Sequence, residues 1–175
     1  MKKIFIISCI ALVFMSCNKE PRYTTTAPEI DVAKTFIDAY ETQNWEVWRS
    51  QYTDSSKIYH NTWKTASSPE EVMDSHKTMI ANLESYGFEK EPIYYERTID
   101  DEGDVWVNFW GQWIGVLKES KKKVEIPVHL SIRFVDGKNV EEYGFWNPSD
   151  YVNGLIEIQS QEISELPQDA VSQLH

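Results

Sequence analysis

Residues 124–146 read VEIPVHLSIRFVDGKNVEEYGFW. Apolar and polar residues alternate through the first part of this stretch, which is typical of a β-strand with one face in a core. Val128, Leu130, Ile132 and Phe134 form the core face, whereas Pro127, His129, Ser131 and Arg133 form a polar face. Asp136-Gly137 is a hairpin-turn dipeptide. The sequence therefore predicts two antiparallel strands, over residues 124–135 and 139–146.

The residues before this hairpin extend the strand pattern toward the N-terminus. We expect strands over residues 93–99 and 105–114, joined by a turn at residues 101–104, with a charged turn at residues 119–123. Another strand, over residues 57–63, is rich in β-branched and aromatic side chains. These segments predict a sheet built mainly as an antiparallel meander.

Helical patterns lie ahead of the meander. Apolar residues recur at three- and four-residue steps over residues 29–42, and a short helix is expected over residues 45–52. Ser68-Pro69-Glu70-Glu71 has the pattern of a capping box with proline at the first helical position, and this helix is expected to continue to Gly87. Helices followed by a meander indicate an α+β fold, with the helices on one face of a curved antiparallel sheet.

The N-terminus has the three parts of an export signal: Met1-Lys2-Lys3, an apolar run from Ile4 to Met15, and Ser16-Cys17. The run is shorter than the roughly 20 residues that span a bilayer. Residues 14–17 resemble a bacterial lipobox, which implies lipid attachment at Cys17 and an anchored envelope protein. Asn18, in place of aspartate, makes the outer membrane the expected location. The alternative is an ordinary secreted protein that is cut nearby.

These signals divide the chain into four parts. We expect a signal peptide over residues 1–16, a polar tether over residues 17–28, one domain over residues 29–159 and a polar tail over residues 160–175. The formal net charge is −11. A surface with this charge repels nucleic acid, so nucleic-acid binding is not expected.

Several segments together resemble the nuclear transport factor 2-like superfamily, SnoaL-like branch. They are residues 36–40, 44–46, Tyr52, His60-Asn61, 132–142 and 145–147. The resemblance implies a cone-shaped α+β roll, related to the cystatin-like folds, with a pocket at its wide end. It also implies a pocket carboxylate at positions that here hold Asn61 and Asn147. Because asparagine does not titrate, neither residue can act as a general base.

Aromatic and histidine side chains are the remaining candidates for a pocket. The expected set is His60, Asn61, Trp63, Trp110, His129, Trp146 and Asn147. His60 and His129 are the candidate bases, and the alternatives are a hydrogen-bonded sheet histidine for His60 and a solvent or dimer contact for His129. His60, His76 and His129 lack the short spacing of metal ligands, so neither a metal nor a cofactor is expected.

Strand 105–114 carries aromatic residues on both faces, so both are expected to be covered. The helices would cover one face. A partner subunit, a ligand or residues 151–158 would cover the other. Three functions follow from these features. The leading one is an envelope-anchored module that binds a small, largely apolar molecule without catalysis. The alternatives are a SnoaL-like isomerase, cyclase or dehydratase that uses His60 or His129, and a dimeric structural module without a ligand.

Overall fold

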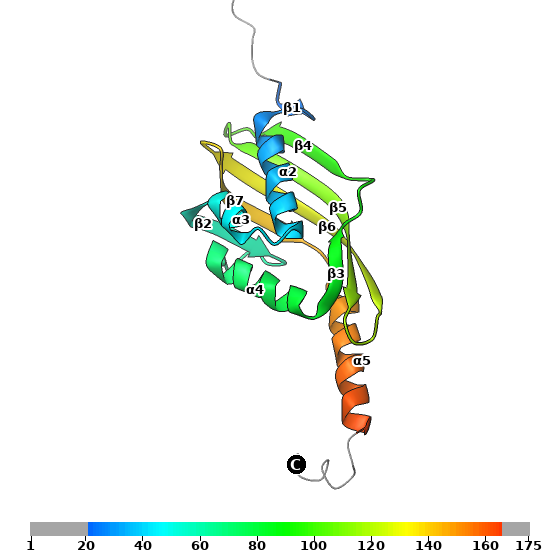
Figure 1. Cartoon of the computed structure of the whole chain (residues 1–175). Helices are drawn as coiled ribbons and strands as arrows, with labels where there is room; N and C mark the ends of the chain where they lie inside the picture. Colours follow the sequence, from blue (N-terminus) through cyan, green and yellow to red (C-terminus); the bar gives the residue numbers. More distant parts are fainter. Residues whose placement is uncertain (1–20, 166–175) are drawn as a thin grey trace, which may run out of the picture.

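A computed structural model describes residues 21–165 of the chain (Figure 1). The expected signal peptide, Cys17 and residues 166–175 lie outside the described residues. Four helices are present within them, at α2 (Pro28–Glu41), α3 (Trp45–Ser50), α4 (Pro69–Ala81) and α5 (Ser149–Glu165). None of these helices is both long and apolar enough to cross a membrane.

Seven strands form one curved sheet. They are β1 (Tyr23–Thr24), β2 (Tyr52–His60), β3 (Leu83–Phe88), β4 (Tyr94–Ile99), β5 (Val105–Leu117), β6 (Lys123–Val135) and β7 (Lys138–Phe145). Their order is β1-β4-β5-β6-β7-β2, and β3 pairs with the far end of β5. The strands from β4 to β7 form the predicted antiparallel meander. The sheet is not wholly antiparallel, because β2 runs parallel to β7.

The two strongest local predictions are confirmed. Asp136 and Gly137 both have positive φ, at 50° and 73°, as the tight hairpin between β6 and β7 requires. Ser68 caps α4 by accepting a hydrogen bond from the backbone N–H of Glu71, and the Glu71 carboxylate accepts one from the backbone N–H of Ser68.

The helix expected to reach Gly87 is shorter than predicted. It ends at Ala81, and the chain then forms β3, in which Gly87 pairs with Ile114 of β5. The backbone N–H of Phe88 donates to the Glu41 carboxylate at 2.7 Å, which ties this strand to α2. Pairing with β5 therefore overrides the helical pattern here.

The ends of the domain also differ from the expected boundaries. Residues 23–24, assigned to the tether, form β1 and pair with β4. Residues 160–165, assigned to the tail, continue α5, which extends beyond the sheet (Figure 1). The first turn of α5 packs against the fold through Tyr151, which is buried and donates to the carbonyl of Met79 at 3.1 Å.

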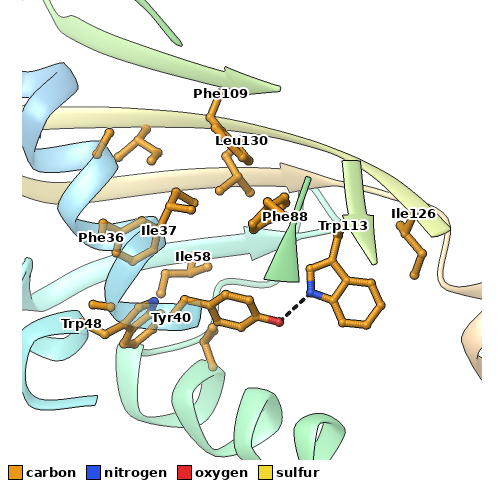
Figure 2. Close-up of a cluster of buried hydrophobic side chains, with 14 of the residues drawn as sticks. Phe36, Ile37, Tyr40, Trp48, Ile58, Phe88, Phe109, Trp113, Ile126 and Leu130 are labelled. Carbon is orange, nitrogen blue, oxygen red and sulfur yellow. Dashed lines mark hydrogen bonds between the residues drawn. The ribbon is translucent and has the colours of Figure 1, made fainter. Parts of the chain in front are cut away.

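Helices α2, α3 and α4 lie on the concave side of the sheet, and the core lies between these two layers (Figure 1). On β5, Val107, Phe109 and Trp113 point into the core. Trp113 Nε1 donates to Tyr40 Oη at 3.1 Å, so a hydrogen bond joins β5 to α2 within the aromatic cluster (Figure 2). The alternate residues of β5 point to the convex side, which none of the four helices between residues 21 and 165 covers.

Candidate functional site

A cavity of about 460 Å³ lies between the helices and the concave side of the sheet. Its size falls within the range of small-molecule sites. Aromatic residues form much of its wall: Phe36, Tyr40, Trp48, Phe88, Trp113, Trp146 and Tyr151. Several of these rings converge from α2, α3, β3 and β5 (Figure 2). Val72 and Met79 of α4 and Val128 and Leu130 of β6 add aliphatic surface.

One buried carboxylate, Glu142 of β7, lies at the wall of this cavity. Its Oε1 atom lies 2.9 Å from Nε2 of His60, at the end of β2. Its Oε2 atom accepts hydrogen bonds from Tyr52 Oη at 2.7 Å and from Asn139 Nδ2 at 2.8 Å. The side chain of Glu142 is 2% exposed and that of His60 is 19% exposed, so the carboxylate is the more deeply buried partner of the pair.

The hydrogen bonds around Glu142 determine its charge. Burial alone acts to raise the pKa of Glu142. The hydrogen bond from His60, the charge of His60 and the hydrogen bonds from Tyr52 and Asn139 outweigh burial and lower that pKa below its ordinary value. Burial, followed by the charge of Glu142, raises the pKa of Tyr52 well above its ordinary value. Tyr52 therefore stays protonated as a donor, and Glu142 is ionised at neutral pH.

This network also fixes the tautomer of His60. An ionised carboxylate only accepts hydrogen bonds, so Nε2 of His60 carries the proton that points at Glu142. In neutral His60 the lone pair is then on Nδ1. No residue between 21 and 165 forms a hydrogen bond with this Nδ1. In a histidine held in this way by a carboxylate, Nδ1 is the nitrogen that can accept a hydrogen bond or a proton.

Close packing at Gly144 holds the His60 ring in place. Gly144 lies beside His60 across the parallel β2–β7 pair. A Cβ atom at Gly144 would lie 2.6 Å from the Trp146 ring and 2.8 Å from Cδ2 of His60. The His60 and Trp146 rings meet edge to face, with centroids 4.7 Å apart. Only glycine leaves room for this arrangement.

A second histidine, His76 of α4, faces the same cavity. Its ring centroid lies 5.9 Å from that of His60 and 5.0 Å from that of Tyr40. Burial, and then the charge of His60, lower the pKa of His76 to about 3. His76 is therefore a neutral imidazole in the wall of the cavity.

Three of the residues predicted for the pocket line this cavity: His60, Asn61 and Trp146. Asn61 follows β2 with a φ of 53°, and its Oδ1 atom accepts a hydrogen bond from the backbone N–H of Trp146 at 2.9 Å. Asn61 therefore holds the ends of β2 and β7 together rather than supplying a titrating group.

The other four predicted residues lie outside the cavity: Trp63, Trp110, His129 and Asn147. Asn147 accepts hydrogen bonds from the backbone and hydroxyl of Ser149 at the start of α5. His129 and Trp110 lie on the convex side of the sheet, because Val128, Leu130 and Phe109 occupy the concave side. Because successive side chains of a strand point to opposite faces of the sheet, His129 points away from the cavity that its neighbours Val128 and Leu130 line.

On the convex side, rings from adjacent strands form a row that we call the outer aromatic row: Tyr94, Trp110, His129, Phe145 and Trp63. Trp110 and His129 stack with centroids 4.7 Å apart, and Nδ1 of His129 donates to the carbonyl of Phe109 at 3.1 Å. Trp110 is 37% exposed and Trp63 is 71% exposed. Residues 151–158 do not cover this face.

Glu142 and His76 are two polar residues of the cavity wall that the predicted pocket set did not include. Glu142 shares its side of β7 with buried Gly144, and this alternation marks it as inward-facing. His76 is four residues after Val72 and three before Met79, a spacing that places all three side chains on one side of α4. Both signals were present, but the partner of Glu142 is 82 residues away in the sequence.

No protein-family model matches the sequence, and a search of curated proteins finds no match. Solved structures do match. A protein from Shewanella putrefaciens assigned as a SnoaL-like polyketide cyclase is 15% identical, with a TM-score of 0.57, over 75% of this chain and 88% of its own. IdmH from Streptomyces antibioticus, assigned as a polyketide cyclase, is 14% identical, with a TM-score of 0.59, over 73% and 97%.

A protein from Catenulispora acidiphila with a ketosteroid isomerase-like fold is 9% identical, with a TM-score of 0.52, over 66% of this chain and 84% of its own. At these identities the similarity concerns the fold alone. The chain therefore has the nuclear transport factor 2-like α+β fold found in SnoaL-like polyketide cyclases, as the sequence resemblance predicts.

Proposed function

We propose that this domain binds a small, largely apolar molecule in the cavity between α4 and β6. The observation that carries this proposal is the cavity itself, which stays open at about 460 Å³ although aromatic side chains crowd its walls. Water in such a cavity forms few hydrogen bonds with the apolar walls. An apolar ligand that displaces this water buries both its own apolar surface and that of the walls, which favours binding.

A cavity-filling substitution tests the proposal. Val128 of β6 lines the cavity, and Val135 is an exposed residue of the same strand outside it. Val128→Trp should abolish the binding of apolar probes such as 2-acetylnaphthalene in equilibrium dialysis, whereas Val135→Trp should leave it unchanged. Equal binding by both variants would place the ligand elsewhere and contradict the proposal.

A second candidate function is proton transfer with His60 as base, acting on a carbonyl compound or a polyketide-like molecule. The observation that favours it is the Glu142–His60 pair, because the carboxylate holds Nε2 and leaves Nδ1 as the nitrogen that can accept a proton next to an apolar space. The names of the cyclase-like structural neighbours agree with this chemistry. His129 is less suited, because it lies on the convex side of the sheet, outside the cavity.

Deuterium uptake by 2-acetylnaphthalene in D₂O, measured by NMR, tests the second candidate. Exchange at the methyl carbon next to the carbonyl should require His60 and be lost in His60→Gln. With the His129→Gln variant, the ketone should take up deuterium as fast as it does with the native protein. If the ketone takes up deuterium equally fast with His60→Gln and with the native protein, His60 is not the base.

We also propose that the domain is displayed on a membrane through lipid at Cys17. The lipobox-like residues before Cys17 and the export signal support this proposal. Mass spectrometry of the protein from a bacterial membrane fraction should find a diacylated or triacylated cysteine as the first residue. Cys17→Ser should remain unacylated and leave that fraction. An unmodified Cys17 in the native protein would contradict the proposal.

A further inference from the structure

We propose that His76 is the residue that selects the ligand, by hydrogen bonding to a neutral oxygen atom of a molecule that is otherwise apolar. The inference rests on the proposed binding function and adds the chemical class of the ligand, an uncharged carbonyl or hydroxyl compound. It assigns a role to a histidine that the fold itself does not use as a hydrogen-bonding residue.

The position of His76 points its ring at the cavity. The ring lies on the same side of α4 as Val72 and Met79, which also line the cavity. It packs edge-on against Tyr40, with centroids 5.0 Å apart, and against Trp48, with centroids 5.9 Å apart. Aromatic neighbours hold the ring in place but offer no acceptor in the ring plane.

The hydrogen-bonding capacity of His76 is unused within the protein. Neither of its ring nitrogens has a hydrogen-bond partner among residues 21–165. Three other ionisable side chains in the wall each form at least one hydrogen bond within the protein: His60 with Glu142, Tyr40 with Trp113, and Tyr151 with the carbonyl of Met79. His76 is half-buried and lines the cavity, so a ligand there can reach a donor and an acceptor that the described residues leave unused.

The charges around the cavity determine what that partner is. Burial and the charge of His60 lower the pKa of His76 to about 3, so His76 offers one N–H donor and one lone pair but no positive charge. The lining residues include the carboxylates Glu71 and Glu142, and none of them is lysine or arginine. An anionic ligand would therefore lose its hydration without gaining a counter-charge. A neutral oxygen pays a smaller desolvation cost and finds a hydrogen bond.

Three isosteric probes test this inference by equilibrium dialysis at pH 8. They are 2-acetylnaphthalene, which has a carbonyl oxygen, 2-isopropenylnaphthalene, which replaces that oxygen by a methylene group, and 2-naphthoate, which is anionic. We expect the ketone to bind about tenfold more tightly than the hydrocarbon, as one hydrogen bond allows, and 2-naphthoate to bind most weakly.

His76→Phe keeps an aromatic ring and removes both nitrogens. It should lower the affinity for the ketone about tenfold and leave the hydrocarbon unchanged. His129→Phe, the same substitution on the outer aromatic row, should change neither. His76→Gln, which retains an N–H donor, should recover part of the preference for the ketone. In the native protein, addition of the ketone should shift the ¹⁵N resonances of His76.

The outcomes separate this inference from the binding proposal. If the ketone and the hydrocarbon bind equally well, or if His76→Phe retains the preference, the cavity binds apolar molecules but His76 does not select them. Tightest binding of 2-naphthoate would also overturn the inference. If His76→Phe unfolds, the His76→Gln variant and the ¹⁵N shifts decide the question. If none of the three probes binds to the native protein, the binding proposal and this inference both fail.

Discussion

The two faces of strands β5, β6 and β7 carry similar residue types in very different surroundings. On the concave face, Trp113, Leu130 and Glu142 meet the helices and enclose a cavity. On the convex face, Trp110, His129 and Phe145 form a row that no helix in the described part of the chain covers. Aromatic and titratable residues alone do not mark the site. What distinguishes the concave face is that the helices enclose it, and this brings Glu142, His60 and His76 to the wall of one cavity.

The largest expected contrast between the faces comes from adjacent residues of β7. Glu142→Ala leaves Tyr52 and Asn139 without their acceptor and His60 without its partner. Removing one partner of a buried charged network costs about 3–5 kcal/mol in the free energy of unfolding. Glu141→Ala, on the convex side, removes a partly exposed pair with Arg133 and should cost about 1 kcal/mol or less. Urea unfolding at pH 7.5 measures both. If Glu142→Ala lowers the free energy of unfolding by no more than about 1 kcal/mol, as Glu141→Ala should, the Glu142 network does not stabilise the fold.

A smaller contrast is expected in the pH dependence of stability. Because the pKa of His76 is about 3 in the folded protein and near 6.5 in an unfolded chain, the unfolded state takes up a proton first as the pH falls. The contribution of His76 is therefore complete above about pH 6.5 and is lost progressively toward pH 3. Between pH 7 and pH 5, we expect about 1–2 kcal/mol of unfolding free energy to be lost through this residue.

His76→Phe should flatten this part of the profile, and His129→Phe should not. The lower limit of pH 5 matters, because the lowered pKa of Glu142 adds a further loss of stability below the ordinary range of a glutamate. If the free energy of unfolding falls with pH as steeply in His76→Phe as in the native protein, His76 does not have a lowered pKa in the folded protein.

The smallest effect on stability is expected on the outer aromatic row. Trp110 is 37% exposed, so Trp110→Ser should change the free energy of unfolding by about 1 kcal/mol or less. A homodimer through this face stays a prediction, motivated by exposed Trp63, Tyr94 and Trp110. Sedimentation velocity should show a concentration-dependent dimer for the native protein and a monomer for Trp110→Ser. If the native protein stays monomeric at high concentration, the prediction of a homodimer is wrong.

Local patterns predicted much of the fold. The capping box at Ser68, the Asp136-Gly137 turn and the alternation through residues 127–134 each depend on neighbouring residues, and each is present in the structure. The boundary between α4 and β3 was not predictable in this way. It depends on pairing with the far end of β5, which local propensity does not contain.

The candidate site was predictable only in part. Alternation separated His129 from Leu130 but did not say which face would enclose a cavity, and the pocket set therefore mixed residues of both faces. Glu142 was missed because its role depends on the parallel pairing of β2 with β7, which brings it to His60. The role of a residue that depends on pairing with a strand distant in the sequence cannot be predicted from the residues next to it.

The central claim is that a small apolar molecule occupies the concave cavity and not the convex face. A crystal structure of the protein soaked with 2-acetylnaphthalene tests it most directly. The account predicts the ligand between α4 and β6, with its oxygen within hydrogen-bonding distance of His76. A ligand stacked on the outer aromatic row, with the cavity empty or closed by the protein's own side chains, would contradict it.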